Sequence, residues 1–228
     1  MDIFNTRFER PPATRVAQLA QLASTTVYEA AGQQGAMQHH IRPIAPGMRL
    51  CGAALTVRCA AADNLTLHAA IALAEPGDVI VADVAECVEA GHWGEITTVA
   101  AQARGIAGLV INGGVRDVAP ITRRGFPVFA AAISMKATVK ESIGLIGHPI
   151  VCGGVAIEPG DLVLADDDGI VVVAHDAAGA VIAAAHAREE REAAVMQRLA
   201  NGELTLDLLG FGAAIERRGI VMPQRRGR

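Results

Sequence analysis

Aromatic side chains are scarce in this chain. They make up 3% of its 228 residues, with one Trp, one Tyr and five Phe. Hydrophobic residues nevertheless reach 51%, so the core must be built mainly from Ala, Val, Ile and Leu. Such a core favours packed layers of helices and strands over an all-β sandwich with aromatic anchors. The shortage of rings also argues against binding of single-stranded nucleic acid, which uses aromatic rings as stacking platforms.

The chain also lacks a basic excess, paired cysteines and long apolar runs. Its formal net charge is −4, whereas a nucleic-acid-binding domain needs a basic face. The four cysteines form no Cys-x-x-Cys pair, which disfavours a zinc knuckle or a disulfide framework. No apolar run reaches the roughly 18 residues of a membrane span, and the N-terminus carries no signal-peptide core. We therefore expect a cytoplasmic protein without nucleic-acid or membrane partners.

The apolar pattern predicts helices interleaved with strands. Helices are predicted over residues 13–31, 64–74, 95–103, 121–125 and 177–199, and strands over 48–61, 79–82, 109–111 and 128–132. The run Asp166–Gly169 is interpreted as a hairpin turn, because the ligand spacing and distal Glu of an EF-hand are missing. The pattern predicts an α/β fold and one domain over residues 1–228. A helical extension begins at about residue 177, and a flexible tail covers 220–228.

One short strand leads directly to a pair of opposite charges. The strand 109–111 is followed by Asn112-Gly113-Gly114 and then by Arg116 and Asp117. We expect the backbone to turn at the glycines, which have no Cβ to restrict it. An arginine beside an aspartate at the end of a buried strand suits an anion clamp next to a metal ligand. Taken alone, such a pair is more often a surface salt bridge or a turn-capping Asp.

The start of the 95–103 helix is the expected partner of this pair. The free N–H groups and dipole at a helix N-terminus attract anions. Glu95 and Asp117 are 22 positions apart in sequence, and a helix followed by a strand returns the chain to the same edge. We therefore expect the two residues to converge, although Glu at a helix start is also a common stabilising choice. His92 is a candidate for lining the same pocket, and Lys140 could contact an anion or be solvated.

Motifs of other enzyme classes are missing. The sequence holds no Gly-x-Ser-x-Gly, no Walker loop and no Gly-x-Gly-x-x-Gly. Serine hydrolase, nucleotide kinase and Rossmann dehydrogenase functions therefore lose support.

Several ordered blocks of the sequence resemble the RraA-like family. They are Trp93-Gly94-Glu95, residues 103–117, 125–129, 137–141 and 160–173. The match extends from about Thr25 to Leu209. Glu29 within residues 27–32, together with the segment 201–207, makes the chain most similar to one branch. That branch comprises the class II pyruvate aldolases that act on 4-hydroxy-4-methyl-2-oxoglutarate and 4-carboxy-4-hydroxy-2-oxoadipate.

The resemblance implies a compact α/β fold with a central β-sandwich-like core flanked by helices. It also implies a homotrimer or homohexamer with active sites at subunit interfaces, and a bound Mg²⁺ or Mn²⁺ ion. Asp117 matches the metal ligand, and Arg116 matches the clamp on the substrate carboxylate and the developing enolate. Glu95 stands where the family commonly has Asp, near the metal-bound water, and is the second catalytic candidate.

Further site residues are implied by the same resemblance. The substrate-binding loop that holds the pyruvate carboxylate corresponds to Gly94, Glu95, Ile96, Thr97 and Thr98. Glu29 and Glu192 match acidic residues that a neighbouring subunit can contribute to the site. Pro120 stands where the aldolases usually carry another acid, and Ala137 replaces a frequent Gly.

The implied reaction is cleavage of 4-hydroxy-2-oxo dicarboxylic or tricarboxylic acids to pyruvate and a second 2-oxo acid. Loss of CO₂ from oxaloacetate forms the same pyruvate enolate, so oxaloacetate decarboxylation is the expected side activity. The alternative is a non-catalytic RraA-type regulator that binds a ribonuclease. Glu95 and Pro120 leave this alternative open, whereas the presence of Arg116 and Asp117 favours the aldolase.

Overall fold

The structure is a computed structural model that describes residues 2–220. The chain divides into two compact units, residues 1–185 and 186–228. Of the tail predicted over 220–228, only Ile220 belongs to the described residues.

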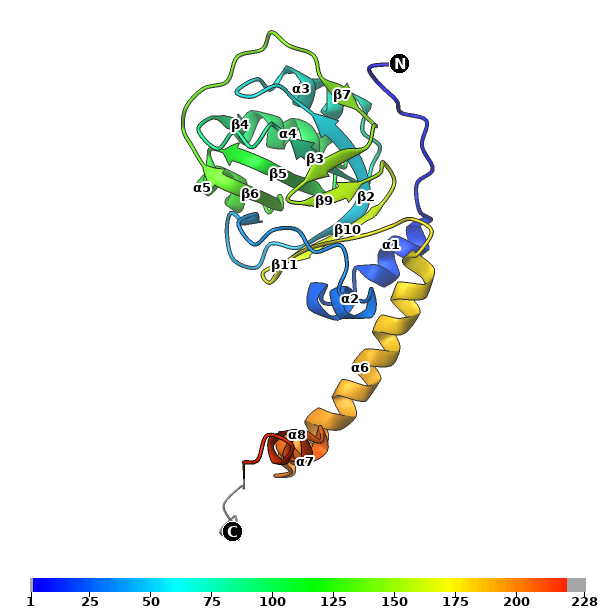
Figure 1. The fold of residues 1–228 in the computed structure, drawn as a ribbon. Coiled ribbons are helices and arrows are strands. Elements are labelled where there is room, and N and C mark those ends of the chain that lie inside the picture. The colour runs from blue at the N-terminus through cyan, green and yellow to red at the C-terminus, as the bar shows by residue number, and fades with distance from the viewer. Residues whose placement is uncertain (1, 221–228) are drawn as a thin grey trace. The chain divides into compact units, whose positions relative to one another are not determined.

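A nine-stranded sheet forms the centre of the first unit (Figure 1). The path of the sheet runs β1-β6-β5-β3-β2-β10-β11, with β4 paired to β5 and β7 paired to β2. The central strands β2, β3, β5 and β6 are parallel, whereas β1, β7, β10 and β11 are added antiparallel. The strands are β1 (Arg42–Pro43), β2 (Leu50–Arg58), β3 (Asp78–Asp83), β4 (Gly91–Trp93), β5 (Gly108–Val115), β6 (Val128–Ile133), β7 (Leu145–Ile146), β10 (Leu162–Asp166) and β11 (Gly169–Val173). A separate hairpin is formed by β8 (Ile150–Cys152) and β9 (Val155–Ile157).

Alternate side chains of each strand enter different apolar clusters, as the pleat of a strand requires. On β3, Val81 belongs to one cluster and Ile80 to another. The cluster that contains Val81 also holds Phe129 of β6 and Val172 of β11, which lie toward opposite ends of the sheet. The sheet therefore curls around this cluster. The predicted α/β fold, with a sandwich-like core of strands flanked by helices, is confirmed.

Helices cover the outer side of the curled sheet. The cluster around Ile80 is completed by α3 (Leu65–Leu73), α4 (Glu95–Ala103) and α5 (Val118–Arg123). A third cluster joins β10 and β11 to α1 (Ala13–Leu19), α2 (Ser24–Ala30) and the first turns of α6 (Ala178–Ala200). The apolar residues of these helices are small aliphatic side chains, as the composition indicated.

The single helix predicted over residues 13–31 is wrong, because the chain bends between α1 and α2. The Arg49 guanidinium binds the carbonyl oxygens of Ala20 and Leu22 at this bend. The Asp166 carboxylate then accepts the Ser24 N–H at 2.8 Å, at the first residue of α2. Arg49, which directly precedes β2, and Asp166 of β10 are distant in sequence and satisfy backbone groups that a continuous helix would have paired internally.

The turn predicted at Gly113 and Gly114 is also wrong, because β5 continues through both glycines to Val115. The chain turns later, at Asp117, which adopts a left-handed conformation with φ 59°. Glycine is needed at both positions because neighbouring atoms occupy the space that a Cβ would take. A Cβ on Gly114 would lie 2.6 Å from the Ala90 carbonyl oxygen, and one on Gly113 would lie 2.2 Å from Val84 Cγ2.

The second unit contains the remainder of α6 together with α7 (Thr205–Leu208) and α8 (Phe211–Glu216). Its part of α6 carries charged side chains in helical register, such as the Arg188–Glu192 pair, in which nitrogen and oxygen are 2.7 Å apart. Within residues 2–220, no helix is both long enough and apolar enough to span a membrane.

We expect Gly114→Ala to lower the free energy of unfolding, because the added Cβ would meet the backbone carbonyls of Val88 and Ala90. Overpacking of this kind costs about 1–3 kcal/mol. Denaturant titration of both proteins measures the difference. Gly179→Ala is the matched control: Gly179 lies on an exposed part of α6, where a Cβ would be 3.7 Å from Arg15 Nη2, an ordinary contact distance, and Ala should raise stability by up to about 1 kcal/mol there. Equal stability of wild type and Gly114→Ala would contradict the close approach of β4 and β5.

Candidate active site

A cavity of about 110 Å³ lies where the start of α4 meets the end of β5. Five of the predicted site residues line it: Gly94, Ile96, Thr97, Arg116 and Asp117. The other lining residues are Asn64, His68, Gly91, His92 and Lys140. The cavity thus combines a helix N-terminus, two basic side chains, a carboxylate and two imidazoles.

The start of α4 is fixed by hydrogen bonds of its own residues. Gly94 precedes the helix, and its N–H donates to Thr97 Oγ1 at 3.0 Å. The Trp93 indole N–H donates to Thr98 Oγ1 at 2.8 Å, which buries Thr98 beneath the helix start. The N–H groups of Ile96 and Thr97 have no acceptor inside the helix, since they lie in its first turn. This end of α4 can therefore donate hydrogen bonds to an anion in the cavity.

The Arg116–Asp117 corner lies directly against this helix start. The Glu95 N–H donates to Asp117 Oδ2 at 3.0 Å, so Asp117 caps α4 from outside the helix. A Cβ on Gly94 would lie 2.5 Å from the same Oδ2, which explains why only glycine fits there. Arg116 Nε is 3.8 Å from Asp117 Oδ2, and both side chains are about two-fifths exposed. No other hydrogen bond or ion pair of the Arg116 guanidinium occurs among residues 2–220, so it is available to bind an anion.

The predicted convergence of Glu95 and Asp117 holds for the backbone of Glu95. The Glu95 carboxylate instead accepts hydrogen bonds from Arg124 Nη2 at 2.7 Å and from Nε at 2.9 Å. Glu95 is absent from the residues that line the cavity. In this structure its N–H contributes to the site, and its carboxylate pairs with Arg124, the residue that follows α5.

Asn64, His68 and Lys140 enter the cavity through contacts that span distant parts of the sequence. Asn64 and His68 lie one helical turn apart at the start of α3, and the Asn64 amide nitrogen donates to the His92 carbonyl at 2.9 Å. Lys140 is held nearby because the Asp63 carboxylate accepts the N–H groups of Glu141 at 2.8 Å and Ser142 at 2.7 Å. The spacing of Asn64 and His68, one helical turn, is the signal in the sequence that they share a face.

Asp63 is an ionised carboxylate next to the part of the cavity that Asn64, His68 and Lys140 line. Burial alone would raise the pKa of Asp63, but the N–H groups of Leu65, Glu141 and Ser142 outweigh it and lower the pKa. Asp63 also binds the start of α3, since its Oδ1 accepts the Leu65 N–H at 2.9 Å. The segment that carries Lys140 is therefore tied to the start of α3.

The two remaining acidic candidates lie elsewhere on the chain. Glu29 is exposed on α2, where Gln33 Nε2 lies 3.3 Å from its carboxylate, and it does not line the cavity. Glu192 belongs to the second unit and pairs with Arg188. Their contribution from a neighbouring subunit stays a prediction.

The donor set fits a divalent ion that is bound by one protein carboxylate. Asp117 Oδ1 has no hydrogen-bond partner in the described structure, whereas Oδ2 is held by the Glu95 N–H. Within residues 2–220, no three His, Cys, Asp or Glu side chains form a metal-binding group. Mg²⁺ is commonly held by one or two carboxylates and completes its shell with water and substrate oxygens. Asp117 is accordingly the residue that would hold such an ion.

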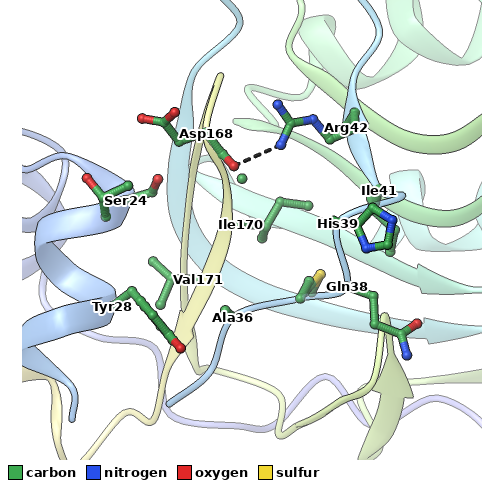
Figure 2. A pocket seen from close by; sticks show the side chains of 13 residues that line it. Ser24, Tyr28, Ala36, Gln38, His39, Ile41, Arg42, Asp168, Ile170 and Val171 are labelled. Atoms are coloured by element: carbon green, nitrogen blue, oxygen red, sulfur yellow. Dashed lines mark hydrogen bonds between the residues drawn. The ribbon is translucent and has the colours of Figure 1, made fainter. Parts of the chain in front are cut away.

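A second cavity of about 160 Å³ lies between α2 and β11, on another part of the first unit. Figure 2 shows Tyr28 of α2 on one side, Gln38 and His39 on the other, and Ile170 and Val171 of β11 between them. Its arginine, Arg42, donates to the backbone carbonyls of Asp167 and Asp168 at 2.6 and 2.8 Å. None of the predicted site residues lines this cavity, so the chemistry is assigned to the cavity at α4.

The comparisons with known proteins agree on one family. The family model described as RraA-like, aldolase/RraA, matches residues 24–172. A Halalkalibacterium halodurans protein, provisionally named 4-hydroxy-4-methyl-2-oxoglutarate aldolase, is 36% identical over 159 residues, which cover 69% of this chain and 75% of that protein.

Two solved structures have a similar fold. RraAS2 of Streptomyces coelicolor, described as an unusual member of the RNase ES inhibitor RraA protein family, is 26% identical with a TM-score of 0.76. The match covers 83% of this chain and 100% of RraAS2. An uncharacterized protein from Pseudomonas syringae is 27% identical, also with a TM-score of 0.76, over 86% of this chain and 97% of that protein. The chain therefore belongs to the RraA-like family.

Proposed function

We propose that this protein is a class II, metal-dependent pyruvate aldolase. Its substrates would be 4-hydroxy-2-oxo dicarboxylic or tricarboxylic acids, which it would cleave to pyruvate and a second 2-oxo acid. The observation that carries the proposal is the meeting of Arg116, Asp117 and the α4 N-terminus around one cavity. The 36% identical relative with the provisional aldolase name supports the same reaction class.

The cavity offers complementary groups to the 2-oxo acid end of such a substrate. The N–H groups of Ile96 and Thr97 would bind the C1 carboxylate, as helix N-termini bind anions. The Lys140 ammonium, which lines the same cavity, adds positive charge. Arg116 would bind the C2 oxygen with guanidinium nitrogens that have no other partner in the described structure.

The reaction breaks the C3–C4 bond of the substrate. The hydroxyl on C4 loses its proton to a base, and its O–H electron pair becomes the second bond of the new carbonyl. The C3–C4 electron pair passes into the pyruvate enolate, whose charge develops on the C2 oxygen beside Arg116. Fixed donors aimed at developing charge contribute several kcal/mol to such reactions. A Mg²⁺ or Mn²⁺ ion held by Asp117 would supply Lewis-acid polarisation of the 2-oxo group.

Two parts of this proposal need residues that do not line the cavity of a single chain. Glu95, the base or relay implied by the family resemblance, would have to leave Arg124 before its carboxylate could act. A homotrimer or homohexamer would allow Glu29 and Glu192 to reach a neighbour's site. Oxaloacetate decarboxylation follows from the same enolate and needs no hydroxyl base.

Similarity to RraAS2 supports a second candidate, a regulator that binds an RNase ES-type ribonuclease. A pull-down of such a ribonuclease, run beside an assay of pyruvate release, separates the two functions. Binding without pyruvate release from any 2-oxo acid would replace the aldolase proposal.

We expect Arg116→Ala to lower kcat/KM for pyruvate release by about 10²–10³-fold, because the enolate oxygen loses its main donor. Arg116→Lys should restore only part of the rate, since an ammonium lacks the guanidinium's paired donors. Pyruvate release is measured by coupling it to the reduction of pyruvate to lactate. Arg123→Ala is the matched control, because Arg123 is exposed on α5 and does not line the cavity. Equal activity of Arg116→Ala and Arg123→Ala would remove Arg116 from the mechanism.

Asp117→Asn should weaken Mn²⁺ binding by at least about tenfold, the loss that follows even when a neighbour of a metal ligand is changed. Asn tolerates the left-handed backbone of Asp117 and can still accept the Glu95 N–H, so the fold should be kept. Titration calorimetry with Mn²⁺ measures the affinity directly. Chelation with EDTA should stop pyruvate release by the wild type, and added Mg²⁺ or Mn²⁺ should restore it. The control is Asp176→Asn, an exposed position, which should leave the Mn²⁺ affinity unchanged. If Asp117→Asn binds Mn²⁺ as tightly as this control does, the assignment of Asp117 as the metal ligand is wrong.

A further inference from the structure

A buried imidazole of the cavity has one nitrogen without a partner. His92 lies on β4, is fully buried and lines the cavity. Its Nδ1 is 3.3 Å from the Gly114 carbonyl oxygen, which can only accept, so Nδ1 carries the proton. In the neutral imidazole the other nitrogen, Nε2, is then an acceptor, and it has no hydrogen-bond partner in the structure. Burial lowers the pKa of His92, which keeps the ring neutral near pH 7.

A second orphan acceptor belongs to the same cavity. The Asn64 amide nitrogen donates to the His92 carbonyl, which leaves its Oδ1 as the free end, and that oxygen is buried without a partner. A buried polar atom without a partner costs about 1–3 kcal/mol. Two such acceptors at one cavity indicate an occupant that brings hydrogen-bond donors. The hydroxyl group of a substrate, or a water molecule, has this character.

The charges that surround His92 allow it to accept a proton. Arg116 and Lys140 line the cavity as cations and would oppose a second positive charge, whereas Asp117 lines it as a carboxylate. The ionised Asp63 beside the start of α3 acts on His92 through its charge and favours the imidazolium. His68, the other imidazole, is only half-buried, and burial together with Lys140 lowers its pKa. The backbone carbonyls of Gly114 and Ala90 favour the charged ring more strongly than Asp63 does, and all three raise the pKa of His92 against the effect of burial.

Glu95 is poorly placed for the same task. Its carboxylate binds Arg124 through two nitrogens and is absent from the lining of the cavity. The His92 ring is held in place by the hydrogen bond to Gly114 and by the packing of β4 against β5.

We propose that His92 Nε2 is the catalytic base that removes the proton from the substrate's C4 hydroxyl during C3–C4 cleavage. This inference rests on the proposed aldolase function and identifies the base of that reaction. As the O–H bond breaks, its electron pair forms the new carbonyl, and the C3–C4 pair forms the enolate. The proton on Nε2 is then returned to C3 of the enolate, which gives pyruvate and restores the neutral ring.

Comparison of two reactions tests the role of His92. Cleavage of 4-hydroxy-4-methyl-2-oxoglutarate requires the hydroxyl base, whereas decarboxylation of oxaloacetate has no hydroxyl proton to remove. In His92→Asn the side-chain amide can still donate to Gly114, but the group at Nε2 is lost. We expect kcat for cleavage to fall by at least about 100-fold, while oxaloacetate decarboxylation stays within about threefold of wild type.

Three companion variants make the result specific. His92→Gln places an acceptor near Nε2 that cannot take a proton, so KM for the hydroxy acid should stay near wild type while kcat falls. His68→Asn and Glu95→Gln should change cleavage and decarboxylation by similar factors. A selective loss of cleavage in His68→Asn or Glu95→Gln, with none in His92→Asn, would assign the base to that residue and overturn the proposal.

The outcomes also separate this inference from the proposed function. Equal losses of both reactions in His92→Asn would show that His92 has only a structural role. A wild-type protein, loaded with Mg²⁺ or Mn²⁺, that forms pyruvate from neither substrate would instead contradict the aldolase function itself.

Discussion

The hydrogen bond from the Glu95 N–H to the Asp117 carboxylate joins the two parts of the candidate site. It links the first residue of α4 to the left-handed corner after β5, across 22 positions of sequence. One carboxylate oxygen is held by this bond, and the other stays available for a metal ion. Because the Asp117 side chain is fixed in this way, the neighbouring Arg116 lies beside the same helix N-terminus. The placement of the Arg116–Asp117 charge pair at the cavity follows from this contact.

Close backbone approach is the condition under which that contact can form. Gly94 leaves room for the Asp117 carboxylate, and Gly114 leaves room for the carbonyl groups that precede β4. Gly91 serves in the same way, since a Cβ there would lie 3.0 Å from Arg116 Cβ. The glycines thus bring β4, β5 and α4 together. His92 is buried between these elements as a consequence, and its Nδ1 is paired with a backbone carbonyl while Nε2 has no hydrogen-bond partner.

The arrangement accounts for how one family can include proteins described as aldolases and as ribonuclease inhibitors. The fold needs the curled sheet and its aliphatic clusters, and these depend on apolar side chains at alternate positions. The cavity depends on a few polar residues at the edge of that sheet, which can change without loss of the core. In this chain Glu95 pairs with Arg124, which follows α5, so an acidic residue at a helix start serves a structural contact. Function in this family must therefore be argued from the cavity and not from the fold.

The sequence alone determined the fold class, the alternating strands and the Arg116–Asp117 pair next to the 95–103 helix, because local apolar periodicity and chain order carry that information. Periodicity could not reveal the bend between α1 and α2, which depends on Arg49 just before β2 and on Asp166 of β10. Glycine at 113 and 114 suggested a turn, but the tertiary structure uses both residues for close packing within β5. Asn64, His68 and Lys140 meet at the cavity only because Asp63 ties the start of α3 to a distant segment. Side-chain pairing over such sequence separations, including that of Glu95 with Arg124, is set by packing in three dimensions, and no local pattern encodes it.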